Sequence, residues 1–110
     1  MVRRDAWLRL AVAETLTKLG YPSGPAALER LAFDGDPRIR RQVAESMGQL
    51  SRRTFVTTLV RLLDDRHDIR KVALASLRHI VPEDASQTSD GSLLTIDQQV
   101  SRWKRWYADQ

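Results

Sequence analysis

The chain of 110 residues contains no cysteine. This absence excludes disulfide bonds, thiolate zinc sites and cysteine nucleophiles together. It also fits a reducing compartment, so we expect the protein in the cytoplasm. No run approaches the roughly 18 consecutive apolar residues that a membrane-spanning helix needs. The first twenty residues resemble an export signal only superficially, because Glu14 and Lys18 interrupt their apolar part.

Side chains and motifs for catalysis are also scarce. The two histidines, His67 and His79, are twelve residues apart, and without cysteines or an H-E-x-x-H motif they do not predict a metal site. No glycine-rich phosphate loop, G-x-S-x-G elbow or dinucleotide fingerprint occurs. Asp64 and Asp65 form a carboxylate pair, but a helix end followed by a cap explains it. We therefore expect no enzyme, no cofactor and no metal.

The composition is that of one globular domain with an excess of positive charge. Hydrophobic residues make up 42% and charged residues 29%, and the net charge is +4. The excess is concentrated in residues 51–80, which carry seven basic and three acidic side chains. Such a segment fits an acidic or nucleic-acid partner, or a solvated helical surface that uses arginine.

Three segments of the chain repeat one another. LRLAVAETLTKL (residues 8–19) matches residues 39–50 at an offset of 31, and these match IRKVALASLRHI (residues 69–80) at an offset of 30. In each copy the apolar residues fall within about 80° of a helical projection. A period near 30 residues is typical of stacked helical units. We predict that Val43 and Met47 of the middle copy are buried core.

The segments between the copies predict shorter helices joined by tight turns. Asp36 can cap the middle helix, and Pro37 fits its first turn. The sequence therefore predicts an all-α, right-handed α-solenoid of about two and a half units. The expected helices span residues 4–19, 25–33, 37–49, 52–64, 67–80 and 95–108.

The repeated unit resembles a known family. It combines an Asp at the end of a first helix, a short turn and the pattern Val/Ile-Arg-x-x-Ala/Val-Ala-x-Ser-Leu/Met at the start of the second. This pattern is similar to the HEAT-like repeat, in particular the short bacterial variety of the PBS-lyase type. The resemblance implies a structural ladder in which Asp34 pairs with Arg40 and Asp64 with Arg70. The first copy departs from the pattern, because Arg3 stands where its Asp belongs.

The C-terminal part predicts a loop followed by a capping helix. Residues 81–94 lose the apolar periodicity, and Thr95 and Gln98 form a capping-box pattern. We expect one domain, with HEAT-like repeats in residues 1–80, this linker, and a capping helix in residues 95–110. The aromatic residues of that helix either pack on the last repeat or, among its arginines, stack nucleobases.

For function, the sequence favours a non-catalytic protein-interaction or scaffold module that uses the outward ridge of the second helices. Its partner is another protein with an acidic surface, and no membrane is involved. A nucleic-acid-binding module is the alternative, and an enzyme resembling DNA glycosylases or bilin lyases a further one. The proposed contact residues are Arg38, Arg41, Glu45, Lys71 and Arg78.

The first copy adds an apolar edge to these candidates. Trp7 and Leu10 occupy the places that Arg38 and Arg41 hold in the middle copy. We expect both side chains to be exposed, and exposed apolar patches mark interaction sites. We expect this edge to contact a second copy of the protein, a further repeat or the C-terminal helix folded back. The alternative is that the first five residues cover it.

Overall fold

The computed structural model describes the backbone of residues 2–81 and 94–110 and, within these, the side chains from residue 5 onward. This part of the chain is helical with short turns and contains no β-strand. The all-α prediction is confirmed, although the expected helix 52–64 is divided in two. The expected loop 81–94 lies, apart from its two ends, outside the described residues. The elements are α1 (Val2–Lys18), α2 (Ser23–Leu31), α3 (Pro37–Leu50), the 3-10 helix η1 (Arg53–Phe55), α4 (Val56–Leu62), α5 (His67–Ile80) and α6 (Ile96–Ala108).

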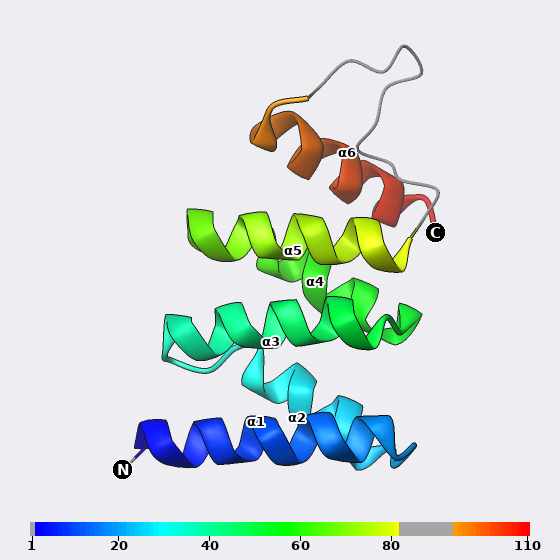
Figure 1. Ribbon diagram of the computed structural model, residues 1–110. Helices are drawn as coiled ribbons and strands as arrows, with labels where there is room; N and C mark the ends of the chain where they lie inside the picture. The colour runs from blue at the N-terminus through cyan, green and yellow to red at the C-terminus, as the bar shows by residue number, and fades with distance from the viewer. Residues whose placement is uncertain (1, 82–93) are drawn as a thin grey trace.

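The helices form a stack in two layers (Figure 1). Helices α1, α3 and α5 lie roughly parallel, one after the other, and the shorter α2 and α4 cross behind them. Helix α6 lies over α4 and α5 at the opposite end from α1. This succession of helix pairs, each in contact with its neighbours, is an α-solenoid.

The middle copy folds as its sequence predicts. Asp36 caps α3, and its Oδ1 accepts a hydrogen bond of 2.9 Å from the backbone N–H of Arg38. Pro37 stands in the first turn, where its missing N–H leaves no hydrogen bond unmade. Val43 and Met47 are fully buried, which confirms the predicted core face.

Helices α3 and α5 approach each other closely because Gly48 has no side chain. A Cβ atom at Gly48 would lie 2.8 Å from the Cβ of Ser76. The hydroxyl of Ser76 donates a hydrogen bond of 2.7 Å to the carbonyl oxygen of Ala44. This contact joins neighbouring units through their second helices, and it leaves no space for a larger residue at position 48.

Helix α6 begins with the predicted capping box and packs on the repeats through its aromatic residues. Thr95 Oγ1 accepts from the N–H of Gln98, and the Gln98 side chain accepts from the N–H of Thr95. Trp103 is fully buried, and Trp106 packs edge-on against it with 5.4 Å between the ring centroids. Tyr107 is hydrogen-bonded to Thr57 at 2.9 Å. The aromatic face thus covers the end of the stack. The division of the chain into domains stays a prediction.

Helix α1 departs from the expectation. Leu10 is only 3% exposed, whereas Leu8 and Val12 are 61% and 57% exposed. The predicted exposure of Leu10 was therefore wrong, while Trp7 is exposed as expected. The reason is that α1 packs on α2 and α3 through the side that bears Leu10 and Ala13. No helix of the described part covers the side that corresponds to the core face of α3.

The remaining expectations concern what covers the apolar edge of α1. Helix α6 does not fold back onto α1, because it lies at the other end of the stack (Figure 1). The expectation that the first five residues cover the edge depends on the side chains of residues 1–4, which lie outside those described. Contact with a second copy or a further repeat stays a prediction.

Candidate functional site

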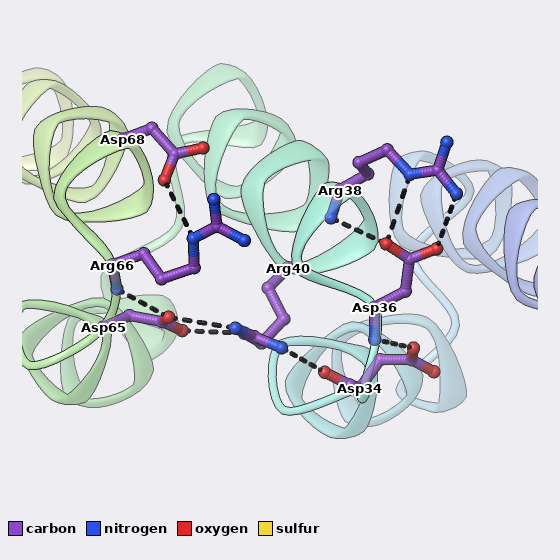
Figure 2. A network of polar contacts seen from close by, with 7 residues as sticks. All are labelled: Asp34, Asp36, Arg38, Arg40, Asp65, Arg66 and Asp68. Carbon is purple, nitrogen blue, oxygen red and sulfur yellow. Dashed lines mark hydrogen bonds and ion pairs between the residues drawn. The ribbon is translucent and has the colours of Figure 1, made fainter.

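Arg40 is part of a network of polar contacts that joins neighbouring units (Figure 2). Its Nε and Nη2 atoms donate to the carboxylate of Asp65 at 2.8 and 3.1 Å, and its Nη1 atom donates to the carbonyl oxygen of Asp34 at 2.8 Å. The Arg40 and Asp65 side chains are only 18% and 15% exposed. Charge-assisted bidentate contacts of this kind are strong and geometrically specific. Arg40 therefore joins the start of α3 to the ends of α2 and α4.

The electrostatics of this pair follow from its hydrogen bonds. Burial raises the pKa of Asp65, but the hydrogen bonds from Arg40 and from the N–H of Arg66, with the charges of both arginines, outweigh it. The pKa of Asp65 consequently lies below its ordinary value. The hydrogen bond to Asp65 raises the pKa of Arg40, against the opposing effect of burial. The pair is thus fully ionised at neutral pH.

The ladder has different partners from those we expected. Asp34 contacts Arg40 through its carbonyl oxygen, while its carboxylate accepts from the N–H of Asp36. Asp64 forms its ion pair with Lys104 of α6 rather than with Arg70. The expected side-chain pairs were therefore wrong in detail, because each arginine takes its carboxylate from the following unit.

Asp65 and Asp97 are the acidic residues that the sequence interpretation missed. Arg70 Nη1 donates to Asp97 of α6 at 3.2 Å, just as Arg40 reaches forward to Asp65. A signal for them existed, because Asp34, Asp65 and Asp97 are spaced by 31 and 32 residues. This spacing is close to the repeat period, although the offset of 30 residues between the second and third copies pairs Asp34 with Asp64 rather than with Asp65.

The predicted contact residues form a surface that we call the ridge: Arg38, Arg41 and Glu45 of α3 with Lys71 and Arg78 of α5. All five are exposed. Arg38 is hydrogen-bonded to Asp36 at 3.2 and 3.3 Å, and Arg78 donates to Gln99 at 2.8 Å. The side chains of Arg41 and Lys71 form no ion pair and no hydrogen bond with any residue that the structure describes. The structure thus leaves two cations of the ridge open to solvent.

A groove of about 310 Å³ runs between α3 and α5 beside these cations. We call it the ridge groove. Gly48 and Ser76, which are in close contact, both line it. The lining residues are Glu45, Gly48, Gln49, Val72, Ala75, Ser76 and His79. The lining is mainly apolar, with Glu45 as its acidic residue.

The described residues hold no group of three or more His, Cys, Asp or Glu side chains that could bind a metal ion. Within the same residues, no helix combines the length and the apolar character that crossing a lipid bilayer requires. The ridge itself presents exposed cations, one carboxylate and a shallow groove.

Comparison with known proteins agrees with the fold. The family model described as HEAT repeats matches residues 2–78. The chain therefore belongs to the HEAT repeat family, whose repeats generally mediate protein–protein interactions and are typically non-catalytic. No curated protein and no solved structure matches the chain.

Proposed function

We propose that this protein is a non-catalytic interaction module that binds an acidic protein surface through the ridge. The observation that carries the proposal is the position of Arg41 and Lys71. They lie on neighbouring second helices, they are exposed, and no ion pair within the described structure neutralises them. Exposed cations beside a groove favour encounter with a negatively charged partner. A cytoplasmic location stays a prediction.

A comparison with the other arginines of the same helices supports this choice. Arg40 and Arg70 lie one residue before Arg41 and Lys71, and both take part in contacts between units. These contacts favour a structural role for both arginines in the stack. Arg41 and Lys71 have no such role, so the fold does not account for their charge.

The proposal is tested by charge reversal. The variant Arg41→Glu/Lys71→Glu, immobilised, is compared with the parent for the proteins it retains from an extract of the cells that produce it. The control is Arg102→Glu/Arg105→Glu, which carries the same charge change on α6. We expect the ridge variant to lose a partner that the parent and the control both retain. A partner retained equally by all three proteins would contradict the ridge as the binding site.

Nucleic acid is the second candidate partner, because Arg41 and Lys71 could also contact phosphates. Glu45 lies beside them on α3 and disfavours a polyanion, so we place the protein partner first. The two are separated by measuring the binding of a DNA duplex between about 0.05 and 0.2 M salt. Tight binding that falls steeply with salt, and that the ridge variant loses, would favour nucleic acid. Release of bases from alkylated DNA would reveal a glycosylase.

A further inference from the structure

A second groove lies at the opposite end of the molecule from α6, between α1 and α2. We call it the N-terminal groove. It has a volume of about 500 Å³, and its lining is mainly apolar but includes two arginines and an aspartate. The lining residues are Leu8, Arg9, Val12, Ala13, Leu16, Ala27, Arg30, Leu31 and Asp34. Beyond the groove, Leu19 at the end of α1 is 67% exposed, which extends the apolar surface.

The rest of the chain shows what kind of element covers such a face. Leu8 and Val12 correspond in the repeat to Ile39 and Val43 of α3, and both of those are fully buried. In α5 the equivalent residue Ile69 is also fully buried. The helices that pack on α3 and α5 include the short antiparallel helices α2 and α4 that precede them. The same face of α1 has no such helix in the described structure.

Arg9 supplies a hydrogen-bond donor for a helix that would cover this face of α1. It is the repeat equivalent of Arg40, whose Nη1 donates to the carbonyl oxygen of Asp34 just past the C-terminal end of α2. Arg9 is exposed, and it forms no ion pair or hydrogen bond with a residue that the structure describes. The last carbonyl groups of a helix carry partial negative charge and need donors. Arg9 is therefore placed to receive the C-terminal end of a helix.

We propose that the N-terminal groove docks an amphipathic helix of a partner protein, antiparallel to α1, with its C-terminal carbonyl groups at Arg9. Its apolar side chains, spaced by three and four residues, cover Leu8 and Val12. Charge disfavours a second copy in head-to-tail contact. The α6 surface that would meet the groove carries Arg102 and Arg105 beside one acidic residue, Asp97, which already pairs with Arg70, so its net charge has the same sign as that of the groove. This site is separate from the ridge, and its proposal does not depend on the proposed function.

The test uses a helix whose chemistry the protein itself provides. The probe is a fluorescently labelled synthetic peptide of residues 53–65, RTFVTTLVRLLDD, the segment that packs on α5 and ends in two aspartates. Its binding to the full chain is measured by fluorescence anisotropy. We expect saturable binding that the variant Leu8→Lys/Val12→Lys weakens by about ten-fold or more. Both replaced side chains are more than half exposed, so circular dichroism should show an unchanged helix content.

Two controls make the result specific. The ridge variant Arg41→Glu/Lys71→Glu should bind the peptide as the parent does, and a peptide with Leu59→Ser and Leu62→Ser should not bind. The proposal is overturned if the parent shows no binding at about 1 mM peptide, or if the Leu8→Lys/Val12→Lys variant binds as tightly as the parent.

Sedimentation of the chain alone tests the competing occupant. We expect the parent to be monomeric at tens of micromolar. A parent that dimerises at that concentration, and that Leu8→Lys/Val12→Lys converts to a monomer, would assign the groove to a second copy and overturn the partner helix.

Discussion

The contact between Arg40 and Asp65 should stabilise the protein far more than a surface ion pair of the same chemistry. Its two side chains are 18% and 15% exposed and share hydrogen bonds of 2.8 and 3.1 Å. Hydrogen bonds to charged groups contribute about 1.5–3 kcal/mol. The hydrogen bond from Arg40 to the carbonyl oxygen of Asp34 remains when Asp65 is changed. We therefore expect a coupling energy between the Arg40 and Asp65 side chains of about 1–2 kcal/mol.

The measurement is a double-mutant cycle of Arg40→Gln and Asp65→Asn, followed by urea unfolding. Asparagine keeps an oxygen that can accept from the N–H of Arg66, so the cycle removes mainly the charge pair. The matched control is the pair of Arg66 with Asp68, which is 3.7 Å apart with side chains 63% and 51% exposed. Its coupling should be close to zero. Equal coupling energies in the two cycles would refute our account of how the units are joined.

Three further perturbations follow from the packing and charges. Met47→Ala should lower the free energy of unfolding by about 2–5 kcal/mol, because its fully buried side chain leaves a cavity; an unchanged midpoint in urea would show that the core face is wrong. Gly48→Ala should destabilise by about 1–3 kcal/mol, because the new Cβ would lie 2.8 Å from the Cβ of Ser76; a gain in stability, as helix propensity alone predicts, would contradict this contact. The lowered pKa of Asp65 means that its stabilising effect is complete above the unfolded-state pKa of about 4 and is lost as the pH falls through the folded-state value. The difference in stability between the parent and Asp65→Asn should therefore shrink from pH 7 to about pH 3, and a constant difference would contradict the assignment.

The sequence predicts the middle of the stack well because its signals there are local. Asp36 and Pro37 mark the start of α3, and the spacing of Val43 and Met47 defines its buried face. These features depend on backbone geometry and helical periodicity, which neighbouring residues determine. The capping box of α6 is equally local, and it too was predicted correctly.

The sequence predicts the ends of units and the first helix less well, because these depend on which helices are neighbours. Alignment of the copies equates Leu10 with Arg41 but does not show that α1 packs through a different side from α3. In the same way, a separation of six residues within a unit suggested Asp34 for Arg40, whereas the carboxylate comes from Asp65 of the following unit. The packing of neighbouring helices in the folded structure determined both outcomes.

The central claim is that a partner protein binds at the ridge, and site-specific cross-linking tests it most directly. A photoreactive amino acid is placed at Gln49, which is exposed and lines the ridge groove, or at Arg105 on α6. Each protein is irradiated with the partner recovered by the parent. Our account predicts a covalent adduct with the partner from position 49 and none from position 105. An adduct from position 105 alone would contradict it.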